Sequence, residues 1–375
     1  MLRKLIQKEP TRERRSTSLA QLIALHGAGE GGYAVPSPGY TTNVVAYRCI
    51  RMIAEAAASV PLRTTEAGAV LSDGELVRLI AQPSPDQTGT ELFEEIYSFL
   101  QTHGNAYVER LDDGASTRAL FLLHPDSVEQ KGSTYRIRIE KGERRVSPDL
   151  RGRSPILHLK LWQPLSGEGG FAPLQSAKEA IRHHNAAGAW NRQLLENAAR
   201  PSGALIHKGP DGSQHLTPEQ FDRLRSELDQ GFSGAKGAGR PLLLDGGLDW
   251  RPMGLTPAEM DFQNLKNSAA RDIALAFGVP PMLLGIPGDN TYANYREANL
   301  AFWRQTVLPL VSKVTGALSG WLDPSRLCAI EPDTSALEAL APERSSRLDR
   351  IASADFLTDQ EKRVALGFSA FPEGV

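Results

Sequence analysis

Residues 256–285 carry the sequence TPAEMDFQNLKNSAARDIALAFGVPPMLLG, which predicts one long helix with a sharp end. Thr256 followed by Pro257 is a typical helix start, because threonine caps the first turn and proline suits the first helical position. Gly278 and the two prolines that follow it end the helix, since proline cannot continue its hydrogen bonding. Apolar residues recur at helical spacing along one side: Ala258, Phe262, Leu265, Ala269, Ile273 and Ala276.

A second long helix is predicted upstream, over residues 171–200. At 100° per residue, Lys178, Arg182 and Arg192 fall in one polar stripe, whereas alanines and Trp190 lie opposite and allow a neighbouring helix to approach closely. The stripe is either a solvated helix face or a surface for DNA or a partner subunit. Two such helices can run antiparallel and hold the segment between them at their far end.

That intervening segment, residues 201–254, is predicted to be a small α/β insert with strands at 204–207 and 241–244. Its helix begins at Thr217-Pro218, and Gln220 completes the start signal. Beyond residue 285, a loop with small, polar and aromatic residues leads to a long helix over 293–322, which Pro309 should kink. This loop is either a plain helix connection or a loop exposed for contact.

The region before the helices, residues 40–165, is predicted to be an α+β unit. A helix capped by Thr41 or Thr42 runs to Val60, and another covers 90–102. Short strands follow at 105–110, 119–123, 135–140 and 156–161. Residues 1–39 are predicted to form a basic, flexible arm, with attachment to an acidic partner or to nucleic acid as the alternative. A strand is predicted at 326–330 and a helical tail from Pro342. The fold class is therefore α+β.

Composition limits the possible functions. The chain has 375 residues, enough for two or three units at about 100–200 residues each. Its 42 Lys and Arg against 44 Asp and Glu give a net charge of −2, which excludes a clamp that neutralises many phosphates. Cys49 and Cys328 form no Cys-x-x-Cys pair, so no disulfide framework or cysteine zinc site is expected. No segment is long and apolar enough for a membrane span.

A search for catalytic patterns finds none. The glycine-rich residues 234–240 lack the order of a P-loop and lead into a predicted strand, whereas a P-loop opens a helix. His183 and His184 are adjacent on a helix and point about 100° apart, so they cannot bind one ion together. The other histidines have no carboxylate at chelating spacing on a predicted helix. We therefore expect no catalytic residue, metal or cofactor.

Five segments, taken in order, resemble bacteriophage portal proteins of the HK97 type. They are AYRCIRMIAEA with SVPL at 46–62, GNAYVE at 104–109, LLHP at 122–125, NAARPSG at 197–203 and AFGVPPMLLG at 276–285. The resemblance implies a portal fold whose parts are the wing (40–165), stem helices (166–200 and 255–285), clip (201–254), tunnel loop (286–296), kinked helix with return strand (297–335) and tail (336–375). Because the tail is short, a crown must be short or absent. The arm matches none of these motifs.

This resemblance also implies a function. Such portals form a ring, a dodecamer, at one capsid vertex of the virion, and double-stranded DNA passes through it without sequence specificity. The large terminase docks on the clip during packaging, the head-tail adaptor later takes its place, and the major capsid protein surrounds the ring, which is assembled in the cytoplasm of a bacterial host. The sequence does not separate a phage or prophage portal from that of a gene transfer agent.

The resemblance assigns expected roles to particular residues. The tunnel loop would bring to DNA the residues Asp289, Asn290, Thr291, Tyr292, Asn294 and Arg296. The stem stripe of Lys178, Arg182 and Arg192 would face DNA or a neighbouring subunit. The clip would meet the terminase and the adaptor through Glu219, Asp222, Arg223, Lys236 and Arg240. The alternatives are a head-tail adaptor or another ring-forming connector, and a terminase-like enzyme, which the missing P-loop disfavours.

Overall fold

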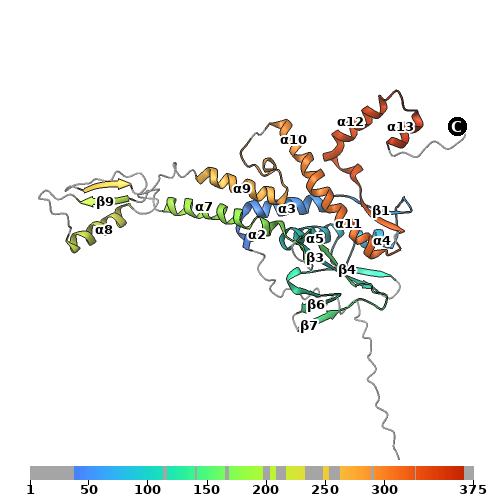
Figure 1. Ribbon diagram of the computed structural model, residues 1–375, viewed down its shortest axis with the longest axis horizontal. Coiled ribbons are helices and arrows are strands. Elements are labelled where there is room, and N and C mark those ends of the chain that lie inside the picture. The colour runs from blue at the N-terminus through green and yellow to red at the C-terminus, as the bar shows by residue number, and fades with distance from the viewer. Residues whose placement is uncertain are drawn as a thin grey trace, which may run out of the picture.

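The computed structural model describes ten stretches of the chain. They are residues 38–112, 116–139, 142–164, 169–196, 203–207, 217–232, 248–252, 262–288, 291–325 and 327–366. The predicted arm lies almost entirely outside them. Helices and small antiparallel sheets form one body, and two long helices project from it and hold a small unit at their far end (Figure 1). The predicted α+β class is confirmed.

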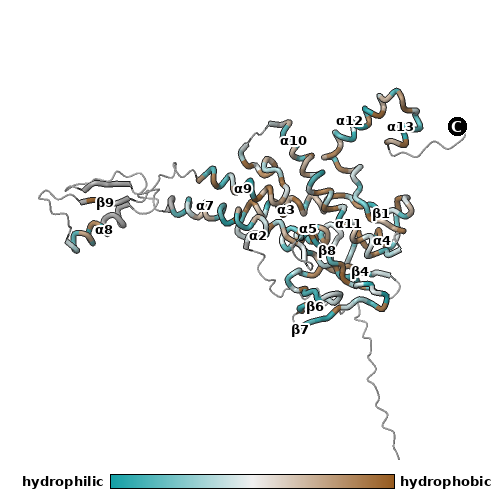
Figure 2. The backbone as a smooth tube through the Cα atoms, in the orientation of Figure 1, coloured by the Kyte–Doolittle hydropathy of each residue, from teal (hydrophilic) through white to brown (hydrophobic). Residues whose placement is uncertain are grey.

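The core of the body is built around helix α3 (Val44–Ala58). Its residues Cys49, Ile50 and Ile53 are fully buried, because apolar side chains at helical spacing place one face against neighbouring elements. Those neighbours include α5 (Gly89–His103), α9 (Phe262–Phe277) and α11 (Leu308–Leu322). Figure 2 shows the hydrophobic residues concentrated where these helices meet. The long helix predicted from Thr256 to Phe277 therefore contributes directly to the core through α9.

The helix ends of this core agree with the prediction at some positions and not at others. The expected cap of α3 at Thr41 or Thr42 is wrong, because both residues belong to a short helix, α2 (Pro38–Thr42). Asn43 caps α3 instead, and its side-chain oxygen accepts hydrogen bonds from the backbone N–H groups of Val45 and Ala46. Helix α5 starts after Thr88, which forms a reciprocal capping box with Glu91.

Three small sheets complete the described part of the body. One joins β1 (Leu62–Glu66), β2 (Ala69–Leu71) and β11 (Cys328–Pro332), with β1 in the centre. The second has the order β4-β3-β8, from Thr117–Leu123, Asn105–Asp112 and Ile156–Lys160. The third is a meander of β5 (Val128–Lys131), β6 (Thr134–Ile139) and β7 (Gly142–Val146). The four strands predicted at 105–161 are confirmed as β3, β4, β6 and β8, and the return strand is confirmed two residues later, as β11.

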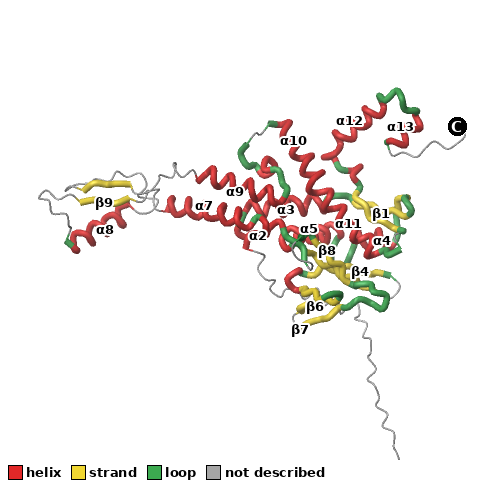
Figure 3. The backbone as a smooth tube through the Cα atoms, viewed as in Figure 1, coloured by secondary structure: helices red, strands yellow, loops and turns green. Residues whose placement is uncertain are grey.

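The last long helix is interrupted. Helix α10 (Tyr292–Ala301) passes into a π-helical segment, η3 (Phe302–Val307), and then into α11. Pro309 is the second residue of α11, and its missing N–H leaves the carbonyl of Gln305, inside the π segment, without its regular helical partner. The predicted distortion is thus found one turn before the proline. Helices α4 (Glu75–Ala81), α12 (Ala341–Ala352) and α13 (Asp359–Ala365) lie at the edge of the body (Figure 3).

None of the helices in the described part of the chain is long and apolar enough to span a membrane. Both cysteines are free, as the sequence predicted: Cys49 is buried and Cys328 is partly buried. Burial raises the pKa of the Cys49 thiol to about 12, so this thiol is unreactive at neutral pH.

Candidate functional site

The projecting helix pair consists of α7 (Lys178–Glu196) and α9, which lie side by side (Figures 1 and 3). The single helix predicted over 171–200 is interrupted, since a short helix, α6 (Pro173–Ser176), precedes α7 and Ala177 forms a turn between them. Near the outer end of the pair, the ring of Trp190 stacks on that of Phe262 at 5.5 Å. Ala187 is buried, so the alanine side of α7 provides the close contact, as its sequence pattern predicts.

The opposite side of α7 is polar along its length. Lys178, Arg182 and Arg192 are all exposed, and Arg182 forms an ion pair with Glu179 at 2.7 Å. Asn185, which the helical pattern puts in the same stripe, contacts the body instead, because its Oδ1 accepts a hydrogen bond from Asn43 Nδ2 at 2.8 Å. The polar stripe is therefore divided into two exposed parts, one at each end of the helix.

The small unit at the far end contains a two-stranded sheet and one helix among its described residues. Strand β9 (Gly203–His207) is confirmed, but its partner is β10 (Leu248–Pro252), while the predicted strand at 241–244 lies outside the described residues. Helix α8 (Pro218–Phe232) begins as predicted: Gln220 N–H donates to Thr217 Oγ1, and Thr217 N–H donates to Gln220 Oε1.

Helix α8 carries the described part of the predicted docking surface. Glu219, Asp222 and Arg223 are exposed, and the Phe221 side chain among them is 56% exposed. An exposed aromatic residue beside charged ones is typical of a protein contact surface. Lys236 and Arg240, the other two residues predicted for this surface, lie outside the described residues.

The connection after α9 is held in place at two points. Gly278 adopts a left-handed φ of 67°, and its carbonyl accepts a hydrogen bond of 2.6 Å from Thr306 Oγ1 in the π segment. A short helix, η2 (Pro281–Leu284), follows and ends at Gly285, also left-handed. The guanidinium of Arg271 on α9 then donates to the carbonyl of Pro287. Neither Thr306 nor Arg271 was predicted, since each acts across a long sequence separation.

Helix α10 begins at Tyr292, one residue before the start predicted for the last long helix, so residues 292–296 of the predicted tunnel loop are helical. Thr291 caps this helix, and its Oγ1 accepts a hydrogen bond of 3.2 Å from Asn294 N–H. Thr291, Asn294 and Arg296 are exposed, the last two on the first turns of the helix. Asp289 and Asn290 lie outside the described residues.

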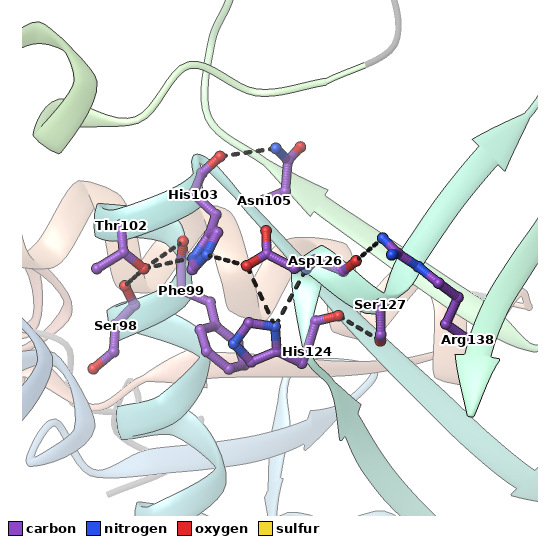
Figure 4. Close-up of polar contacts among 9 residues, drawn as sticks. All are labelled: Ser98, Phe99, Thr102, His103, Asn105, His124, Asp126, Ser127 and Arg138. Atoms are coloured by element: carbon purple, nitrogen blue, oxygen red, sulfur yellow. Dashed lines mark hydrogen bonds and ion pairs between the residues drawn. The ribbon is translucent and has the colours of Figure 1, made fainter. Parts of the chain in front are cut away.

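One group of side chains in the described structure was missed by the sequence search. His103, His124 and Asp126 belong to different elements, so spacing along a predicted helix could not find them, yet their side chains meet in space (Figure 4). The sequence signal that could have found them is that each of the three residues lies close to the end of a predicted strand. In contrast, His183 is exposed and His184 is partly buried on α7.

Comparison with known proteins gives these features a context. The profile of the family described as phage portal protein matches residues 44–367. A protein of Rickettsia bellii (strain RML369-C) is 38% identical over 346 residues, which is 89% of each chain. The portal protein of Enterobacteria phage HK97 is 25% identical over 298 residues, 75% of this chain and 67% of that protein.

A solved structure is similar to this chain over almost its whole length. A chain in the neck of a native gene transfer agent (GTA) particle, computed with C12 symmetry, is 41% identical and superimposes with a TM-score of 0.68. The match covers 93% of this chain and 99% of that one. The family profile spans the α+β body, both projecting helices and the unit that they hold, and on this evidence the chain belongs to the phage portal protein family.

Proposed function

We propose that this chain is the ring subunit of a portal at one capsid vertex, through which double-stranded DNA enters and leaves the particle. The observation that carries the proposal is the match over almost the whole chain with a subunit of a twelve-fold symmetric particle neck. In a closed ring each subunit presents two different surfaces to its two neighbours. The higher identity with the GTA chain (41%) than with the HK97 portal (25%) favours a particle of the GTA kind, assembled in a bacterial cytoplasm.

Exposed apolar side chains support the ring. Large apolar residues that are 44–78% exposed in the single chain lie on α3, α7 and α9. They are Val44, Tyr47, Trp190, Leu265 and Leu275. Burial of each of these side chains against another subunit would lower its free energy. Neighbouring subunits would cover them.

DNA contact is proposed for the start of α10 and for the polar side of α7. Thr291, Asn294 and Arg296 are exposed. The first two carry neutral hydrogen-bond donors and the third is a cation, and such groups suit contacts with phosphate and sugar that do not read the bases. Such contacts must be weak, since DNA has to slide and every contact is repeated around the ring. The near-neutral net charge agrees with weak contacts.

Partner docking is proposed for the unit at the far end of the helix pair. The exposed Phe221, with Glu219, Asp222 and Arg223 around it, would contact the large terminase and then the head-tail adaptor. The major capsid protein would surround the body.

The family is structural, and we propose that the chain has no catalytic activity. A phosphate-release assay with DNA present tests this, because DNA-stimulated nucleotide hydrolysis would indicate a terminase-like enzyme instead.

Electron microscopy of the purified full-length chain tests the ring. We expect rings with a central hole and, in particles, a rotational symmetry of twelve. A monomer or small dimer without a hole, at high protein concentration and with capsid protein present, would contradict the proposal.

A packaging assay with Arg296→Ala tests DNA contact. We expect rings to assemble normally and DNA-filled particles to become fewer. Arg145→Ala, at an exposed arginine on β7, serves as the matched control and should package normally. Normal packaging by the Arg296 variant would remove this side chain from the mechanism.

A further inference from the structure

Three side chains from neighbouring elements bring potential metal ligands together in the body. His103 is the last residue of α5, His124 directly follows β4, and Asp126 lies in the short helix η1 (Pro125–Ser127). The Nε2 atom of His103 is 3.7 Å from Asp126 Oδ2, and Nδ1 of His124 is 3.9 Å from the same oxygen. The three ligand atoms lie within 4.8 Å of one another (Figure 4).

The hydrogen bonds of His103 suit metal binding through Nε2. The hydroxyl of Thr102 donates to the backbone carbonyl of Ser98 at 2.8 Å, and its oxygen lies 2.8 Å from His103 Nδ1. In the tautomer with the proton on Nδ1, the Thr102 oxygen accepts from this nitrogen and Nε2 is the atom that can bind a cation beside Asp126. Metal-binding histidines typically have their second nitrogen hydrogen-bonded in this way.

His124 presents its Nδ1 atom to the same carboxylate. This nitrogen accepts a long hydrogen bond of 3.3 Å from the backbone N–H of Asp126, and an ion bound to it would replace that hydrogen bond. The ring of Phe99 contacts both imidazoles edge to face, at 5.7 Å from His103 and 5.1 Å from His124, and fixes their orientation. Two imidazole nitrogens and a carboxylate oxygen thus converge, and a cation placed between them would be attracted by all three.

The two histidine side chains are largely shielded from water, since they are only 18% and 17% exposed. Neutral imidazole is the form that binds a metal.

We propose that His103, His124 and Asp126 bind one divalent metal ion of the zinc type. Two imidazole nitrogens and one carboxylate oxygen are ligands that such ions accept, and water would take the fourth position beside Asp126, whose side chain is 52% exposed. Tetrahedral zinc holds its ligand atoms about 3.3 Å apart. The two distances to Asp126 must therefore shorten by about half an ångström, which movement of this exposed side chain can supply. The two histidine nitrogens, which lie within 4.8 Å of each other, must approach by up to about 1.5 Å through rotation of their rings.

The bound ion would connect separate parts of the body. Asp126 also links to the third sheet, because its backbone carbonyl accepts a hydrogen bond of 2.6 Å from Arg138 on β6. An ion held by His103 and Asp126 would tie this sheet to the end of α5. Its role is then structural, and it goes beyond the proposed portal function.

Calorimetric titration of tag-free, full-length protein with Zn²⁺ tests the site, together with the visible absorption of bound Co²⁺. We expect one ion per chain in the wild type. His103→Gln and the conservative, exposed Asp126→Asn should each weaken binding at least tenfold, and Thr102→Val should weaken it about 10–100-fold because the second nitrogen no longer has its hydrogen-bond acceptor. Bound Zn²⁺ should raise the melting temperature of the wild type but not of His103→Gln.

His183→Gln is the matched control, since it removes an exposed histidine on α7, and its affinity should equal that of the wild type. Circular dichroism without metal checks that each variant is folded. Equal Zn²⁺ affinity of wild type and Asp126→Asn, or the absence of stoichiometric binding by the wild type, would overturn the proposal.

Discussion

At the scale of single residues, Gly278 determines how the long helix α9 ends. Its φ of +67° is unfavourable for any residue with a side chain, and an added Cβ would lie 2.9 Å from Thr306 Oγ1. We expect Gly278→Ala to lower the free energy of unfolding by about 1–2 kcal/mol. Urea unfolding of the dissociated chain measures this change.

Gly316 provides the matched control for that substitution. It lies within α11, and an added Cβ would have no neighbour within 4 Å. Gly316→Ala should therefore stabilise the chain by about 0.5–1 kcal/mol, because alanine loses less backbone entropy in a helix. If both substitutions shift stability in the same direction, the strain assigned to Gly278 is wrong.

His158 should make stability depend on pH. Its Nε2 donates to Asn105 Oδ1 at 2.8 Å, and its ring stacks on Tyr107 at 4.4 Å. Burial, assisted by the charge of Lys160, lowers its pKa to about 4. The unfolded chain, with an ordinary pKa of about 6.5, binds more protons between these two values, so the free energy of unfolding must fall as pH drops through this window.

The matching measurement is urea unfolding at several pH values between 7 and 4. His158→Gln keeps a donor for Asn105 but does not titrate, so its stability should decrease less steeply than that of the wild type. Some pH dependence should remain, because burial lowers the pKa of His184 as well. Parallel curves for the two proteins would show that His158 is not a source of the effect.

At the scale of elements, the cap of α10 has to be separated from any DNA contact made by the same residue. Thr291→Ala removes the oxygen that accepts from Asn294 N–H and should destabilise the first turn by about 1 kcal/mol. Thr291→Ser keeps this oxygen and should not. Hydrogen exchange of the Asn294 amide measures the cap: it should become faster in the alanine variant only, and unchanged exchange in that variant would contradict the assignment.

Helix ends set by local signals were predictable from sequence. Thr217 and Gln220 form the expected capping box, and α9 ends at the glycine and prolines that follow Phe277. The start of α3 was not predictable in this way. Three polar residues stand in a row at 41–43, and the side chains of Thr42 and Asn43 both contact Asn185 on α7. Asn43 makes the shorter hydrogen bond, 2.8 Å against 3.5 Å, and also contacts His184. Tertiary contact decided among local alternatives that were nearly equal.

Short polar strands and dispersed clusters escaped prediction for related reasons. Strand β7 contains Glu143, Arg144 and Arg145, a pattern without an apolar alternation, and it is a strand because it pairs with β6. The convergence of His103 and Asp126 depends on how α5 meets η1. Neither feature has a local signal, because each is created by the packing of elements that are distant in sequence.

At the scale of the whole molecule, the total charge conceals the distribution that matters for a channel. The net charge is −2, yet the exposed ends of the α7 stripe are cationic and would recur in every subunit of a ring. Because Ala187 and Trp190 face α9, Lys178 and Arg192 point away from the helix pair and are available to DNA or to the next subunit. In a symmetric ring, the few positive charges that one subunit contributes would be repeated by every other subunit.

This arrangement predicts a salt effect for purified rings. If Lys178 and Arg192 meet DNA, the double variant Lys178→Ala/Arg192→Ala should still form rings but bind double-stranded DNA more weakly. The slope of log affinity against log salt should become shallower by about 0.9 for each phosphate that the ring no longer neutralises. Fluorescence anisotropy with a labelled duplex at several salt concentrations measures the slope, and Arg145→Ala serves as the control. Loss of rings with an unchanged slope in those that remain would instead assign the stripe to the contact between subunits, since a lateral contact leaves the number of DNA phosphates neutralised by an intact ring unchanged.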